Sequence, residues 1–185
     1  MKLKKQQSKY FKYAVEDLIS NNIDLHFSRT AKVDDCGGYF DPDGRQLKVA
    51  TWNSAWFITF VHEYNHYKQW KTRTRLWAAA EDLEFFEDFS PKHVLSVQLM
   101  EQECDKMSWK DIKEYDIESA QKYISKANAY HVSYRNMVEK KEWVKRAPYR
   151  FEDILKYCPD DRFFTIKELT KPKKKLYDAI SKKCF

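Results

Sequence analysis

The amino-acid sequence predicts an α+β fold, with a small N-terminal sheet or hairpin packed on a helical body. Two observations lead to this prediction. The segments with a strand-like pattern lie in the first third of the chain, and later segments space apolar residues three or four apart. With 185 residues, 43% of them hydrophobic, the chain can bury a substantial core. The aromatic content of 16%, against 3 Gly and 5 Pro, excludes collagen-like, low-complexity and generally disordered classes.

The first elements are expected to be a helix and then a strand. Phe11, Val15 and Leu18 form one apolar stripe, which predicts a helix over residues 9–21. Residues 23–33 have β-branched and aromatic character with some alternation, which predicts a strand.

A β-hairpin is expected next. Pro42-Asp43-Gly44 is a turn signal, because Pro fixes φ and Gly accepts a positive φ. It separates Tyr39-Phe40 from the strand-like residues 47–51. The second of these strands is expected at an edge, where it would either pair with an extended peptide or remain a plain edge strand.

Helices are expected to make up most of the remaining chain. Residues 55–70 contain no Gly or Pro and begin with two apolar turns, which predicts a largely buried helix with Ser54 as its N-cap. Ser90-Pro91 begins a second helix, since Pro is favoured at the first helical position. A third helix covers about residues 118–143.

The end of the chain is expected to be more irregular. Pro148 closes the third long helix, and two short helices follow it. The acidic residues 81–89 are expected to form a loop or a short amphipathic turn. Residues 1–147 are therefore expected to form the main domain, and residues 148–185 a C-terminal extension with a basic tail.

The cysteines and the charge restrict the setting of the protein. Four widely spaced cysteines form no CxxC pair, which favours reduced thiols in a cytoplasmic compartment. No apolar run is long enough for a membrane span, so no membrane partner is expected. The net charge of +6 includes lysine-rich stretches at both ends, which leave nucleic acid as a weakly supported partner.

The motif His62-Glu63-Tyr64-Asn65-His66 is the most informative feature of the sequence. Positions i and i+4 of a helix differ by about 40° around the axis, so both imidazoles project from one face. Two such nitrogens can bind one Zn²⁺, and Glu63 can act on a metal-bound water. Chance placement of these residue types predicts roughly 0.01 such matches in a chain of this composition.

A third metal ligand is expected in the segment Glu101-Gln102-Glu103-Cys104-Asp105. Glu101 and Asp105 share one helical face, so Glu101 can bind the metal while Asp105 accepts a hydrogen bond from a ligand histidine. Glu103 lies about 200° around the helix from Glu101, so the two cannot bind the same ion. Glu101 is favoured over Glu103, which stays open as the alternative.

These motifs resemble those of the gluzincin metallopeptidases and, more narrowly, of the ImmA/IrrE-like minimal metallopeptidases. The resemblance covers about residues 37–108, from the Gly-Gly-Tyr-Phe-Asp-Pro hairpin through HEYNH to EQECD. It implies a zincin-like fold and Zn²⁺ held by His62, His66 and Glu101. It also implies Glu63 as the catalytic carboxylate, and a peptide or protein substrate. Cys104 departs from the small alanine that this family usually has, and the last seventy residues match no part of it.

The chemistry of such a site predicts a mechanism. Zn²⁺ lowers the pKa of its water toward about 7, and Glu63 takes the proton as general base and returns it to the leaving amine. The oxyanion would be stabilised by one of Tyr130, His131, Tyr134 or His93.

Two alternatives remain at this point. A non-catalytic module could keep the zincin fold and bind metal, nucleic acid or a regulatory protein. Two histidines and a carboxylate also occur in non-haem iron oxygenases, which rank below zinc because their ligands usually lie on a β-barrel. Proteins of this size and arrangement are often encoded by phages or mobile elements, in which case the compartment is the host cytoplasm.

Overall fold

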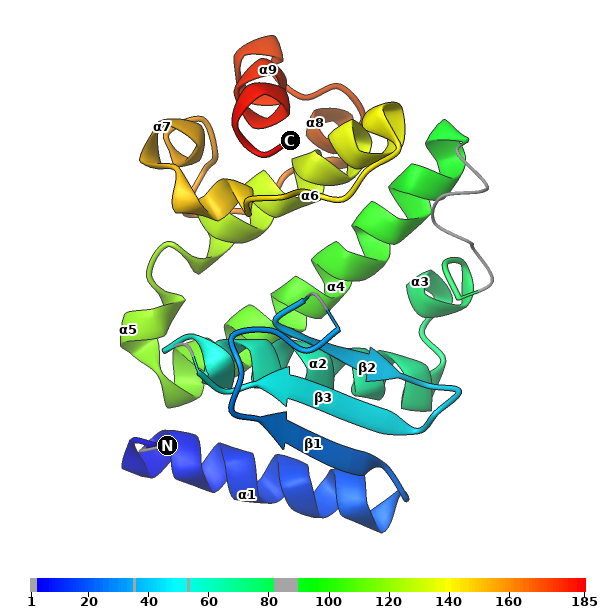
Figure 1. Cartoon of the computed structure of the whole chain (residues 1–185), viewed down its shortest axis with the longest axis vertical. Coiled ribbons are helices and arrows are strands. Elements are labelled where there is room, and N and C mark those ends of the chain that lie inside the picture. Colours follow the sequence, from blue (N-terminus) through cyan, green and yellow to red (C-terminus); the bar gives the residue numbers. More distant parts are fainter. Residues whose placement is uncertain (1–2, 35, 53, 82–89) are drawn as a thin grey trace. The chain divides into compact units, whose positions relative to one another are not determined.

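A computed structural model describes residues 3–34, 36–52, 54–81 and 90–185. The chain forms two compact units, and each is described by itself (Figure 1). The N-terminal unit comprises Met1–Arg73 and Met107–Ser119, and the C-terminal unit comprises Thr74–Lys106 and Ala120–Phe185. A three-stranded sheet among many helices confirms the predicted α+β class.

The sheet of the N-terminal unit has the order β1-β3-β2. Its strands are β1 (Asp24–Ser28), β2 (Gly38–Asp41) and β3 (Gln46–Ala50). β2 and β3 are antiparallel neighbours, which confirms the hairpin, whereas β1 pairs with β3 in parallel. The prediction of an edge strand at residues 47–51 is wrong, because β3 is central and pairs on both sides. An added peptide strand would therefore have to use β1 or β2.

The hairpin turn depends on Asp41 more than on a positive φ at glycine. Its carboxylate accepts the backbone N–H groups of Asp43 and Gly44, and a Cβ at Gly44 would collide with that carboxylate. The sequence predicts a positive φ at Gly44, and this is wrong, because the positive φ of the turn, 47°, is at Arg45. Glycine is required here because of the close approach of the side chain.

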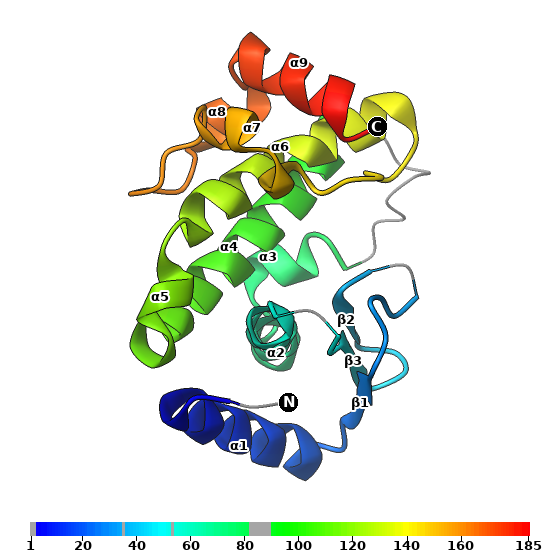
Figure 2. The same ribbon diagram turned by 60° about the vertical axis from the view of Figure 1, so that its left-hand side comes forward.

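Two helices cover one face of this sheet (Figure 2). They are α1 (Lys5–Ser20), which confirms the first predicted helix, and α2 (Trp56–Thr72). Aromatic rings join the layers, since Phe11 of α1 lies 5.5 Å from Phe27 of β1 and 4.8 Å from Phe60 of α2. The apolar start of α2 is buried as predicted. The prediction of Ser54 as N-cap is wrong, because Ala55 occupies that position without a side-chain cap.

Helix α4 (Pro91–Tyr115) begins at Pro91 as predicted, and its residues 107–115 belong to the N-terminal unit. The predicted helix over 118–143 is divided into α5 (Ile117–Ala120) and α6 (Tyr123–Lys140). Lys122 has a left-handed φ of 59°, which interrupts the helix between them. The predicted loop at 81–89 lies almost entirely outside the described residues.

The C-terminal unit is built around α4 up to residue 106 and α6. Its other elements are α3 (Arg75–Ala78), the 3₁₀-helix η1 (Pro148–Arg150), α7 (Glu152–Leu155), α8 (Ile166–Thr170) and α9 (Lys174–Lys183). Ala129 and Val132 of α6 share a buried core with Leu155, Leu169 and Ile180. Residues 148–185 thus supply much of the core of this unit. The two compact units meet in the chain after Arg73, Lys106 and Ser119, and none of these places is residue 147.

No helix among the described residues is long and apolar enough to cross a membrane.

Candidate metal centre

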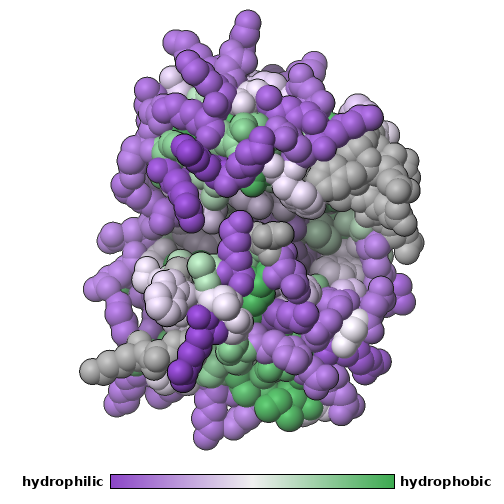
Figure 3. All heavy atoms as spheres, in the orientation of Figure 1, coloured by the Kyte–Doolittle hydropathy of each residue, from purple (hydrophilic) through white to green (hydrophobic). Residues whose placement is uncertain are grey.

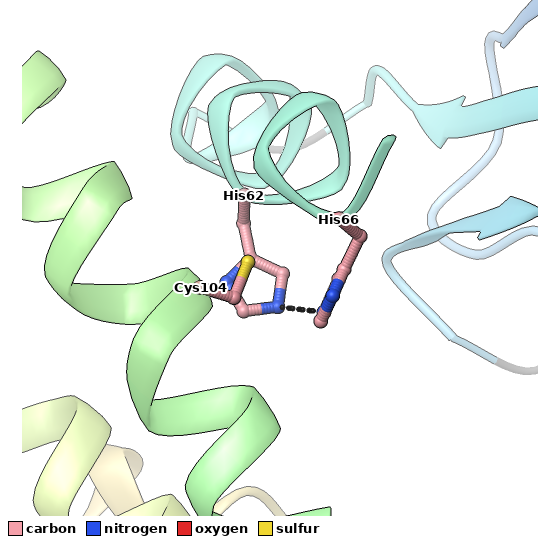
Figure 4. Close-up of side chains that lie close together, drawn as sticks. All are labelled: His62, His66 and Cys104. Atoms are coloured by element: carbon pink, nitrogen blue, oxygen red, sulfur yellow. Dashed lines mark hydrogen bonds between the residues drawn. The ribbon is translucent and has the colours of Figure 1, made fainter. Parts of the chain in front are cut away.

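His62 and His66 project from the same face of α2, as the i, i+4 spacing predicts (Figure 4). Their Nε2 atoms lie 3.0 Å apart, and their rings are nearly perpendicular, at 86°. Only one of the two nitrogens can carry a proton in this contact, so the other presents a lone pair. Cys104, also drawn in Figure 4, comes from α4.

The pair of imidazoles fits the requirements of a zinc ion. Two nitrogens bound to one tetrahedral Zn²⁺ at about 2.05 Å lie about 3.3 Å apart. The observed separation of 3.0 Å needs an opening of a few tenths of an ångström, which a small rotation of either ring supplies. The donor set of neutral imidazole nitrogens also suits Zn²⁺.

His66 is oriented by a partner within its own helix. Its Nδ1 lies 3.0 Å from Oε1 of Gln69, which is three residues further along α2. Because an amide oxygen only accepts hydrogen bonds, this contact is a hydrogen bond in the tautomer that carries the proton on Nδ1. The sequence predicts that Asp105 accepts a hydrogen bond from a metal-binding histidine. For His62 this stays a prediction.

Tyr64 and Asn65, which lie between Glu63 and His66, hold α2 against its neighbouring helices. Tyr64 donates its hydroxyl to Asp17 of α1 at 2.8 Å, and burial, followed by Asp17, raises the pKa of Tyr64. The Asn65 amide donates to Ser108 at 3.1 Å and to Asp111 at 3.2 Å, both on the last turns of α4. These contacts fix the rotation of α2 about its own axis, and with it the direction of the histidines.

Glu63, the expected general base, is buried on α2. Cys36, in the loop before β2, lies close enough to Glu63 for the two side chains to interact electrostatically. Burial raises the pKa of the Cys36 thiol, and the Glu63 carboxylate raises it further.

The remaining metal-ligand candidates lie on the part of α4 that belongs to the C-terminal unit. Glu103 accepts a hydrogen bond from Thr74 at 2.7 Å within this unit. Asp105 receives the Tyr123 hydroxyl on Oδ1 at 2.6 Å. Glu101 is half-buried and shares a helical face with Cys104 and Asp105, which are three and four residues further on.

The expected oxyanion donors also belong to the C-terminal unit. His131 is 1% exposed, and its Nε2 lies 2.9 Å from Oδ2 of Asp105. Tyr134 is buried, and its ring packs edge-on against Tyr130 at 5.6 Å. His93 is half-buried near the start of α4. His131 and Tyr134 therefore contribute to the packing of their own unit.

Sequence reasoning missed two residues that suit this chemistry. Gln69 could have been found, because it follows His66 at i+3, a spacing at which helical side chains meet. Cys104 is more than a departure from a family pattern, because a buried thiol close in sequence to Glu101 is itself a zinc ligand type.

Comparisons with known proteins give no relative for this arrangement: no protein-family model, no curated protein and no solved structure matches the chain.

Proposed function

We propose that the chain is a zinc-dependent peptidase of the zincin type, in which His62 and His66 bind the metal and Glu63 is the general base. The geometry of the two histidines carries the proposal, since their Nε2 atoms are 3.0 Å apart and Nδ1 of His66 lies 3.0 Å from Oε1 of Gln69. The resemblance to the ImmA/IrrE-like metallopeptidases supports the same assignment. The substrate class is a peptide or protein.

Glu101 is proposed as the third ligand. Glu103 is less suitable because Thr74 already holds its carboxylate. Cys104 is the alternative, because a thiolate is a common zinc ligand and the residue is fully buried. Mutation distinguishes these candidates directly.

The residues of α2 suffice to derive the proton transfer. A bound Zn²⁺ would lower the pKa of a coordinated water to about 7 and polarise the scissile carbonyl. Glu63 would accept the proton of the attacking water and deliver it to the leaving amine. His66, held by Gln69, would keep its Nε2 available without exchanging a proton during turnover.

Metal content tests the proposal first. The purified protein is expected to contain one zinc per chain by inductively coupled plasma mass spectrometry. His62→Ala and Glu101→Ala are expected to lose it, while Glu103→Ala keeps it. Loss in Cys104→Ser with retention in Glu101→Ala would replace Glu101 by Cys104. Absence of stoichiometric metal in the wild type after zinc is added back would refute the metal site.

Activity tests the second half of the proposal. Cleavage of a peptide library is expected from the wild type and not from Glu63→Gln, which should keep its zinc. Equal cleavage by the two proteins would exclude Glu63 as the base. A reducing, cytoplasmic compartment is proposed for this activity, because all four cysteines are free.

A second candidate function is the binding of nucleic acid, and one observation favours it. Residues 120–185 hold 17 Lys and Arg against 8 Asp and Glu. Exposed lysines occupy both ends of α9, and backbone N–H groups of Lys145 and Arg146 donate to the Cys184 carbonyl beside its last turn. Hydrophilic side chains cover most of the face shown in Figure 3.

Salt dependence separates this candidate from nonspecific attraction. Changing Lys174 and Lys175 to Glu is expected to weaken DNA binding and to lower the slope of affinity against salt concentration. The matched control changes Lys5 and Lys9 of α1 to Glu, which alters the net charge equally. Equal weakening by both pairs would mean that only the total charge matters, and would refute a binding surface on α9.

A further inference from the structure

Gln69 is an amide buried within a helix, and its side chain has a specific task there. The residue is 0% exposed, and its Oε1 lies 3.0 Å from Nδ1 of His66. Burying an amide costs free energy unless it is hydrogen-bonded, so a polar side chain at this position needs a polar partner. The partner of its side-chain oxygen is His66, one of the two histidines of the motif.

We infer that Gln69 is a positioning residue that sets the tautomer of His66 and thereby the affinity of the metal centre. The inference rests on the proposed metal site for its second half only. The Gln69 oxygen can only accept, which places the imidazole proton on Nδ1 and the lone pair on Nε2. The contact also fixes the rotation of the ring about its bond to Cβ. Both effects prepare Nε2 for a metal before any metal arrives.

The neighbouring histidine agrees with this assignment. Nε2 of His66 lies 3.0 Å from Nε2 of His62, so one of these atoms must donate. If His66 carries its proton on Nδ1, then His62 donates from Nε2 in the metal-free protein. To bind zinc through Nε2, His62 would have to take its other tautomer, with the ring proton on Nδ1, whereas His66 would already be in its ligand form.

Substitutions at Gln69 separate the acceptor from the bulk of the side chain. Gln69→Met keeps a similar shape and removes the acceptor, whereas Gln69→Glu keeps an acceptor facing Nδ1. Loss of an outer partner of a metal-bound histidine typically lowers metal affinity about 10- to 100-fold. We expect that loss in Gln69→Met, with affinity close to wild type in Gln69→Glu.

The control is a glutamine with a purely structural role. Gln98 is also 0% exposed, and its Nε2 donates to the backbone carbonyl of His131 at 2.8 Å. Gln98→Met removes a buried amide of the same size away from α2. It is expected to lower stability and to leave zinc affinity unchanged.

Two measurements test the inference. Zinc affinity is obtained by competition with a chromogenic chelator, on variants whose circular dichroism matches the wild type. The tautomer is read from long-range ¹H–¹⁵N NMR spectra of the metal-free protein at about pH 8, where unperturbed imidazoles are neutral. The wild type is expected to show His66 protonated on Nδ1, and Gln69→Met a mixture of both tautomers.

The outcomes distinguish the inference from the proposed function. Wild-type affinity in a folded Gln69→Met, or a His66 protonated on Nε2 in the wild type, would overturn the role of Gln69. If the wild type binds no zinc, the proposed function fails, and the tautomer of the metal-free protein still decides whether Gln69 controls His66.

Discussion

Asn128 of α6 makes three side-chain hydrogen bonds within the C-terminal unit. It is 0% exposed. Its amide donates to the backbone carbonyls of Pro159 at 3.1 Å and Arg162 at 2.9 Å, and its Oδ1 accepts the Phe164 N–H at 2.8 Å. One side chain thus holds the loop between α7 and α8. We predict that Asn128→Ala strongly destabilises this unit.

The magnitude follows from the three bonds. Each is worth about 1 kcal/mol net, and leaving a buried N–H such as that of Phe164 unpaired costs about 1–3 kcal/mol. The two carbonyls are only partly buried, so water replaces part of their loss. Alanine returns about 0.5 kcal/mol through its higher helix propensity. The expected loss is about 2–3 kcal/mol, a large fraction of the about 5–15 kcal/mol of a typical domain.

Urea denaturation followed by circular dichroism measures this loss, and amide exchange at Phe164 locates it. Lys126→Ala is the matched control, because Lys126 is exposed on the same helix. The control should change stability by less than about 0.5 kcal/mol. Asn128→Asp keeps the acceptor for Phe164 but turns an oxygen toward two carbonyls, so it should cost at least as much as alanine at neutral pH. A loss in Asn128→Ala no larger than in the control, with unchanged exchange at Phe164, would show that Asn128 does not hold this loop.

Three further predictions concern other contacts. Tyr64→Phe removes the hydrogen bond to Asp17 and should cost about 1 kcal/mol by urea denaturation, and an unchanged midpoint would contradict it. Arg162 pairs with Glu168 through two bonds of 2.8 Å and lowers the pKa of that carboxyl to about 2. A lowered folded pKa stabilises the protein above the unfolded value of about 4.3, so about 1 kcal/mol, screened by solvent, should vanish between pH about 4.5 and 2. Glu168→Gln should lack that component of the acid sensitivity, and equal sensitivity in both proteins would argue against it. Cys36 is half-buried and the other three cysteines are buried, so iodoacetamide should label Cys36 first. Because burial raises the pKa of its thiol, the labelling rate should still rise above pH about 8.5. Equal labelling of all four thiols by mass spectrometry would refute this order.

The site shows where sequence reasoning succeeds. The common face of His62 and His66 depends only on helical geometry over one turn, so the spacing was enough to predict it. The contact of Gln69 with His66 could have been predicted by the same argument, since both residues lie in one helix. The partners of Asp105 could not be predicted in this way, because Tyr123 and His131 are 18 and 26 residues away along the chain and contact it only through tertiary packing.

The fold shows the same division. Turn chemistry, capping and helical periodicity act over a few residues, so local patterns were enough to predict the α+β class, the hairpin, the start of α4 at Pro91 and the paired histidines. Local patterns did not predict that β1 pairs in parallel with β3, which makes β3 central, or that residues 148–185 share a core with α6. Those choices depend on contacts between residues far apart in the chain, where burial of apolar surface selects one pairing among many that the local pattern allows.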